Sequence, residues 1–313
     1  MADASQTTTE RAAFTIGVLG GTSIVGGPLL SLAVRNGLEV LAVSRSTADR
    51  PAAPGVRWCQ PQSPLPPGTR RITAWISLCP IWVVPSLIDW LERMGIETLV
   101  AVSSMSIETK RDSPVAAERN LAGQLAAAED ALTEWAEHRG RRLVILRPTM
   151  IYDGVHDGNI VAIAAFVRRL GWFPLCGRAE GLRQPVHAGD VATACLAAAR
   201  HPAPARLYTL SGGEPLSFRE LVARTCRAGG LPIRTVSLPA WAWNLAARVG
   251  SQLGVAAGLT VGAGMRMNQD LSCDHARATK DLGFQPRAFV PGGGTLGQTA
   301  AFEAARCLAG PNE

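Results

Sequence analysis

The residues best suited to chemistry form a short glycine-rich stretch near the N-terminus, VLGGTSIVGG at residues 18–27. A β-branched run precedes it and a helical pattern follows. Missing Cβ atoms at Gly20 and Gly26 would permit a tight turn and close strand–helix packing, while N–H groups at a helix start bind pyrophosphate. The spacing predicts a dinucleotide-binding loop that includes Gly20, Thr22, Ser23, Ile24 and Gly26. The alternative is a tight turn with no ligand.

Two features of this region refine the cofactor prediction. Ser23 stands where the middle glycine of such a loop usually lies, so its hydroxyl could take part in phosphate binding. Ser44 and Arg45 end the second expected strand, where an NAD site would carry Asp or Glu. An arginine and a hydroxyl suit a 2′-phosphate, which favours NADP(H) over NAD(H). Otherwise Arg45 is an ordinary solvated arginine.

Short β-branched runs alternate with helical stretches from Phe14 to Pro148, which is typical of βαβ units around a parallel sheet. A further run at 206–210 could return to this sheet. The pattern predicts an α/β fold, a Rossmann-type doubly wound parallel sheet with a smaller C-terminal substrate lobe. Strands are expected at 15–20, 38–44, 56–58, 72–78, 97–104 and 142–148, and a long Ala-rich helix at 114–138.

The chain divides into three parts. Residues 1–13 are expected to form a flexible tail and 14–150 a cofactor-binding domain, to which about 187–212 return. The substrate-binding lobe should comprise 151–186 and 213–313. Within these parts Asp190 is expected to be a helix N-cap. Ser217 and Glu220 have the spacing of a capping box.

Composition excludes several classes of protein. No apolar run of membrane-spanning length and no secretory signal are present among the 313 residues, which favours a cytoplasmic protein. The net charge of +6 comes almost wholly from dispersed arginines, so a nucleic-acid partner is not expected. Seven scattered cysteines with no CxxC pair argue against a disulfide framework and against a zinc site, so no metal is expected.

Four motifs together resemble one protein family. They are GGTxxxG at Gly20–Gly26, SSMS at 103–106, LRPTMIYDG at 146–154 and LRQPVHAGDVA at 182–192. The chain is similar to the extended and atypical short-chain dehydrogenase/reductases, the NAD-dependent epimerase/dehydratase group, from residue 14 to about 290. The resemblance implies a nicotinamide cofactor, a small-molecule substrate and a homodimer formed through the long helix.

The catalytic pair of that family is absent. Its YxxxK motif uses tyrosine to exchange a proton with the substrate oxygen and lysine to lower the tyrosine pKa. The nearest alignment puts Asn120 at the tyrosine position and Gln124 at the lysine position. A shift of register does not restore the motif, because neither Tyr152 nor Tyr208 has a lysine four residues later.

Other family positions are present. By resemblance, Ser104 would hydrogen-bond a substrate oxygen, although it could instead satisfy local backbone, and Ser103 would contact the cofactor. Pro148, Thr149 and Tyr152 would line the nicotinamide side of the cleft. Arg183 and His187 fall on an R-x-x-V-H-x-x-D pattern whose arginine contacts the diphosphate in sugar-nucleotide enzymes.

Some positions depart from the family pattern, and one polar group lies outside it. An asparagine often found in the RPxN turn is Thr149 or Met150 here, which weakens a nucleotide-sugar interpretation. His187 is better explained as a satisfied interface histidine than as a base. Asp153 and His156, with Asp157, form a group capable of acid/base work or of substrate binding, or else simply a polar loop and helix cap.

Three functions remain open from the sequence. The cofactor loop favours an NADP(H)-dependent oxidoreductase or epimerase-like enzyme on a small carbonyl or sugar-derived substrate, with Ser104 and an unconventional proton donor or water replacing tyrosine. The missing pair favours a cofactor-binding sensor or assembly factor with little turnover. A non-redox isomerase, cyclase or lyase on the same scaffold is the third.

Overall fold

The computed structural model describes residues 15–46, 53–64, 72–252 and 260–292. Seven parallel strands form the central sheet in the order β11-β6-β5-β4-β1-β2-β3. The order reverses between β1 and β4, which is the switch point where ligands bind in doubly wound folds. The strands are β1 Thr15–Leu19, β2 Glu39–Val43, β3 Val56–Cys59, β4 Ala74–Ser77, β5 Thr98–Val102, β6 Arg142–Pro148 and β11 Leu207–Leu210.

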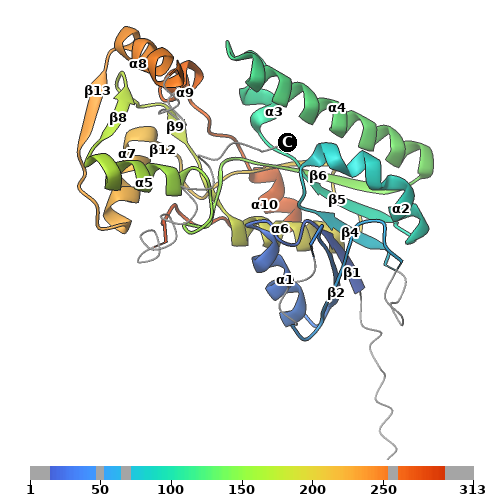
Figure 1. Ribbon diagram of the computed structural model, residues 1–313. Helices are drawn as coiled ribbons and strands as arrows, with labels where there is room; N and C mark the ends of the chain where they lie inside the picture. Colours follow the sequence, from blue (N-terminus) through green and yellow to red (C-terminus); the bar gives the residue numbers. More distant parts are fainter. Residues whose placement is uncertain (1–14, 47–52, 65–71, 253–259, 293–313) are drawn as a thin grey trace, which may run out of the picture.

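Helices cover both faces of the sheet (Figure 1). One face carries α1 Gly26–Arg35, α6 Ala188–Arg200 and α10 Ala276–Leu282, whose apolar side chains join the strands in one core. The opposite face carries the 3-10 helix η1 Ile81–Leu87, α2 Ile88–Arg93 and the long α4 Ala116–Arg139 over a second core. The short α3 Ser106–Thr109 connects β5 to α4. Because both faces are covered, β1, β4 and most of β5 are wholly buried.

The C-terminal lobe has its own core and lies beside the sheet (Figure 1). Its helices are α5 Ile160–Leu170, α7 Phe218–Ala228, α8 Ala240–Gln252 and α9 Val261–Arg266. Three short strand pairs complete the structure outside the main sheet. They are β7 Ile151–Tyr152 with β10 Val186–His187, β9 Leu182–Arg183 with β12 Leu216–Ser217, and β8 Phe173–Cys176 with β13 Thr235–Leu238.

The expected sheet is confirmed, including the return of 206–210 as β11 beside β6. One expected cap is wrong: α6 begins after His187, whose ring nitrogen accepts a hydrogen bond from the Gly189 backbone N–H. The buried Asp190 instead forms an ion pair with the exposed Arg287. The Ser217 hydroxyl does cap α7, but the Glu220 carboxylate pairs with arginines of the same helix rather than completing the box.

The division of the chain into domains stays a prediction. Helix α10 falls within the range 213–313 expected for the lobe, and Ala278 and Phe284 pack in the core shared with α1, α6 and β11. The segment returns to the sheet because its apolar residues have partners there. The expected tail at 1–13 lies outside the described residues. Among the helices described, none is long and apolar enough to cross a membrane.

Candidate functional site

The loop between β1 and α1 is built so tightly that two positions require glycine. Gly20 has φ +72°, and a Cβ there would lie 2.7 Å from the Cys79 backbone nitrogen. A Cβ at Gly26 would lie 2.1 Å from the Gly21 carbonyl oxygen. Both contacts are with backbone, which cannot give way as a side chain can. The loop therefore forms a glycine cradle, Gly20–Gly26, at the switch point of the sheet.

The interior of this cradle fits a ligand that accepts hydrogen bonds. Backbone bonds from Ser23 N–H to Gly20 O (3.0 Å) and from Gly26 N–H to Ser23 O (2.8 Å) fix the turn. The Ser23 hydroxyl oxygen is buried, and among the described residues it has no hydrogen-bond partner. Thr22 is exposed, and Ile24 packs against the core below. An unpartnered hydroxyl at the start of a ten-residue helix fits a pyrophosphate.

The end of β2 lies at the same edge. Leu19 pairs with Val43, and the Gly20 N–H donates to the Val43 oxygen at 3.1 Å. The next two residues, Ser44 and Arg45, therefore leave the sheet beside the cradle. Arg45 is exposed. Its position allows the guanidinium to meet a phosphate bound next to the cradle.

A cleft of about 710 Å³ lies between the carboxyl ends of β5 and β6 and the C-terminal lobe. Five of the residues singled out from the sequence line it: Ser103, Ser104, Pro148, Thr149 and Arg183. The Thr149 hydroxyl donates inward to the Gln184 carbonyl oxygen at 2.5 Å. The Ser104 Oγ accepts a bond from the Ser106 N–H at 3.0 Å. The Ser104 hydroxyl proton thus stays available for a ligand oxygen.

Beneath the cleft, a buried charge network holds the strand ends together. The Ser103 hydroxyl donates to Glu129 at 2.5 Å, so it is committed to the protein rather than to a ligand. Arg147 binds Glu129 through two nitrogens, at 3.0 and 2.6 Å, and also binds Glu108 at 2.9 Å. This network joins β6, α3 and α4 to Ser103, the residue that follows β5.

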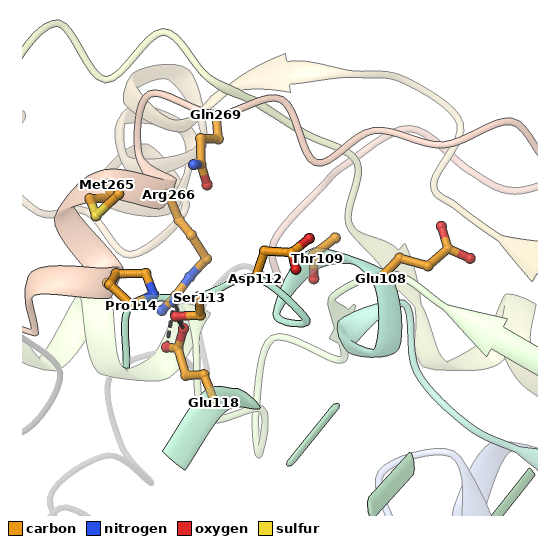
Figure 2. A pocket seen from close by; sticks show the side chains of 10 residues that line it. Glu108, Thr109, Asp112, Ser113, Pro114, Glu118, Met265, Arg266 and Gln269 are labelled. Atoms are coloured by element: carbon orange, nitrogen blue, oxygen red, sulfur yellow. Dashed lines mark hydrogen bonds and ion pairs between the residues drawn. The ribbon is translucent and has the colours of Figure 1, made fainter. Parts of the chain in front are cut away.

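Three charged cleft residues were not anticipated from the sequence: Lys110, Glu118 and Arg266. Arg266 of α9 reaches Glu118 of α4, which also accepts a bond from Ser113 at 2.6 Å (Figure 2). Both residues of this ion pair line the cleft and also a second, smaller pocket of about 150 Å³. Burial opposes ionisation of Glu118, but the bonds from Ser113 and Arg266 outweigh it and lower its pKa.

Lys110 follows α3 and lines the cleft half-buried. Burial, and next the charge of Arg266, lower the pKa of its ammonium, while Glu118 acts in the opposite direction. Among the described residues, no hydrogen bond or ion pair engages the Lys110 side chain. It is one of two lysines in the chain.

Arg183 lies in the cleft as expected, but most of its hydrogen-bonding capacity is used. It donates to the backbone carbonyls of Leu182 (2.8 Å) and Gln269 (2.9 Å), and to that of Arg266. Its guanidinium also stacks near Phe218, 5.4 Å from the ring centre. Burial, and then the charge of Arg266, lower its pKa to about 10.

Several expected site residues are not among those that line the cleft. Asn120 and Gln124 lie exposed on α4. Tyr152 is fully buried; its hydroxyl oxygen accepts a bond from the Val290 N–H at 3.2 Å, and burial raises its pKa. His187 caps α6 and packs edge-on against Tyr152. Burial lowers the pKa of His187, which favours its neutral form.

The acidic and histidine group near 153–157 organises its own loop. Asp153 accepts backbone bonds from Val155 (2.8 Å) and His156 (2.7 Å), and contacts the His156 ring at 3.0 Å. Asp157 accepts from the Ile160 N–H at 2.7 Å. These contacts describe a capped loop at the start of α5, outside the cleft lining. Within the described residues, no group of three or more His, Cys, Asp or Glu could hold a metal.

Fold and site together define a Rossmann-type protein with a glycine cradle and an adjoining cleft. Comparison with known proteins agrees: residues 83–209 match the NAD dependent epimerase/dehydratase family. The resemblance seen in the sequence is thereby confirmed. A UDP-N-acetylglucosamine 4-epimerase from Bacillus cereus shares the fold, with TM-score 0.63 and 14% identity, over 96% of this chain and 98% of that one.

Two further comparisons extend this picture. A UDP-glucuronic acid 4-epimerase from Bacillus cereus, solved in complex with NAD, has TM-score 0.65 and 12% identity, over 93% of this chain and 99% of that one. Among curated proteins, an uncharacterized protein y4nG from Sinorhizobium fredii is 27% identical over 209 residues. That match covers 64% of this chain and 52% of the relative, so the chain spans about half the length of the curated relative it matches.

Proposed function

We propose that the protein binds NADP(H) at the glycine cradle and acts as an oxidoreductase or epimerase-like enzyme on a small carbonyl compound in the cleft. One observation carries this proposal: the cradle and the cleft open at the same carboxyl edge of one parallel sheet. A dinucleotide with its pyrophosphate at Gly20–Gly26 can extend along that edge toward Ser104. The family match supports a nicotinamide cofactor.

The chain's own residues would divide the work. Ser23 and the N-terminal turn of α1 would hold the pyrophosphate, and Arg45 the 2′-phosphate. When bound, the nicotinamide supplies or removes a hydride. Ser104 would donate a hydrogen bond to the substrate oxygen and orient the carbonyl carbon. A water molecule that reaches this oxygen would supply the proton, because Tyr152 is buried elsewhere.

Titration of the purified protein with NADPH and NADH tests the cofactor assignment. Saturation at about 100 times the dissociation constant should stabilise the fold by about 2.7 kcal/mol in a thermal-shift assay. NADPH should bind more tightly than NADH, and Arg45→Ala should weaken NADPH binding about tenfold while leaving NADH unchanged. Arg35→Ala, an exposed arginine at the far end of α1, serves as the control. Failure of both cofactors to bind would overturn the proposal.

A cofactor-binding sensor with little turnover is a second candidate. The exposed positions of Asn120 and Gln124 favour it, since neither lines the cleft in place of the family's tyrosine and lysine. Loss of a general acid lowers rates by about two to four orders of magnitude, which slows hydride transfer without abolishing it. Single-turnover oxidation of bound NADPH by carbonyl compounds would favour the enzyme. Tight binding without any oxidation would favour the sensor.

A further inference from the structure

The cleft has an apolar lining on the side of the C-terminal lobe. Two of its aromatic rings, Phe166 and Phe173, pack edge to face with centroids 5.4 Å apart. The lining side chains from α5, β8 and α7 are Ala162, Ile163, Phe166, Phe173, Phe218 and Leu221. Burying this surface against an apolar ligand stabilises the complex, whereas a hydroxylated ligand would lose hydrogen bonds to water without replacing them.

Most polar groups of the cleft are already used within the protein. The Gln184 amide donates to Gly212 O at 2.8 Å, and its oxygen accepts from Cys273 N–H at 3.2 Å. The Thr260 hydroxyl oxygen caps α9. Ser103, Thr149 and Arg183 are committed as described above. A site that recognises sugar hydroxyls needs several donors and acceptors aimed at the ligand. Apart from Lys110, the polar lining side chains with no side-chain donor bond within the described residues are Ser104, Ser106, Asn159 and Thr260, which are few beside the apolar lining.

Charge in the cleft is unbalanced. The ionisable residues that line it are Lys110, Arg183, Arg266 and Glu118, three cations against one carboxylate. Glu118 is bound by Arg266. Lys110 therefore presents a half-buried ammonium to the cleft with no anion of the described chain in contact. A partly desolvated cation of this kind favours an anionic ligand.

We propose that the substrate is an apolar organic anion: a carbonyl compound with an aromatic or branched aliphatic body and a carboxylate, rather than a sugar nucleotide. Lys110 would bind the carboxylate, the Phe166, Phe173 and Phe218 surface would cover the apolar body, and Ser104 would meet the carbonyl oxygen. The carbonyl reaction rests on the proposed function. Recognition of the anion and of the apolar body rests on the cleft alone.

A matched set of probes tests this by isothermal titration. 2-Oxo-4-phenylbutanoate has both features, 4-phenylbutan-2-one lacks the carboxylate, and UDP-glucose represents the sugar nucleotides. The acid should bind at least about tenfold more tightly than the ketone. Lys110→Gln should remove this difference, and Lys110→Arg should retain it. Lys280→Gln, the other lysine, lies exposed on α10 and should change nothing.

The outcomes separate this inference from the proposed function. Equal affinity for acid and ketone, tighter binding of UDP-glucose than of the acid, or no binding of the acid would each overturn the inference. An unchanged thermal midpoint for Lys110→Gln shows that a lost preference is not caused by misfolding. UDP-glucose carries a pyrophosphate that the glycine cradle could bind, so it is titrated with NADPH already present. NADPH titrated in parallel reports on the proposed function independently, because neither the acid nor the ketone carries a pyrophosphate.

Discussion

The glycine cradle and the cleft lie at the same edge of the sheet but are assembled differently. Seven consecutive residues, Gly20–Gly26, form the cradle, and its shape follows from backbone that leaves no space for a Cβ. The cleft instead gathers side chains from distant elements, and its Glu118–Arg266 pair joins residues 148 positions apart. The first kind of site is determined locally. The second exists only when both lobes have folded.

The largest effect is expected from a substitution within the glycine cradle, because its shape depends on the backbone of neighbouring residues. Gly26→Ala would place a Cβ 2.1 Å from the Gly21 oxygen, so the loop must shift and NADPH binding should be lost. Gly27→Ala is a matched control, since a Cβ there meets nothing within 4 Å. It should retain binding, because alanine suits a helix better than glycine. Fluorescence titration measures both, and intact NADPH binding by Gly26→Ala would contradict the steric account.

The next effect concerns the charge network under the cleft. Glu129→Gln leaves Arg147 without its buried carboxylate and should lower the free energy of unfolding by about 3 kcal/mol. The side chains of these two residues are 7% and 16% exposed. In the control pair, Glu137 and Arg206 are 59% and 50% exposed, so Glu137→Gln should cost less than about 1 kcal/mol. Urea denaturation measures the free energy of unfolding of both variants. Equal losses of stability would show that the network does not hold the strand ends.

A smaller effect is expected for the ion pair between Glu118 and Arg266, which joins the two lobes. The pKa of Glu118 is lowered in the folded protein, so its contribution to stability is present above the ordinary glutamate pKa and is lost as the pH falls through the lowered value. Between about pH 5 and pH 3 the wild type should lose about 1 kcal/mol more stability than Glu118→Gln. Parallel unfolding curves at a series of pH values measure this. Identical pH dependence would mean that the ion pair contributes nothing.

The smallest effect concerns Lys110. Because burial lowers the pKa of its ammonium, the charge should be lost at a lower pH than for an ordinary lysine, whose pKa is about 10.4. Affinity for 2-oxo-4-phenylbutanoate should therefore decline as the pH rises toward that value. Lys110→Arg should keep its affinity over the same range, since arginine stays charged. A decline shared by both proteins would assign the titration to another group.

Local patterns in the sequence were enough to predict the sheet and the cradle. Alternating β-branched runs identified all seven strands, and glycine spacing identified the turn, because each depends on neighbouring residues. Long-range packing decided the rest. Tyr152 and His187 matched family motifs, yet their rings pack against each other away from the cleft lining. Asp190 resembled a helix cap, but Arg287, 97 positions later, pairs with it.

Lys110 could have been noticed from the sequence, because lysine is so rare in this arginine-rich chain. No periodicity, however, indicated that α3 would turn it toward the cleft. Arg266 had no local signal at all, since its partner Glu118 comes from the opposite lobe. The dimer expected through the long helix stays a prediction.

A crystal structure of the protein with NADPH tests the central claim most directly, because it locates cradle and cleft ligands in one view. We expect the pyrophosphate at Gly20–Gly26 within hydrogen-bonding distance of the Ser23 hydroxyl, the 2′-phosphate beside Arg45 and the nicotinamide at the cleft near Ser104. A dinucleotide bound elsewhere, or a nicotinamide pointing away from Ser104, would contradict the account.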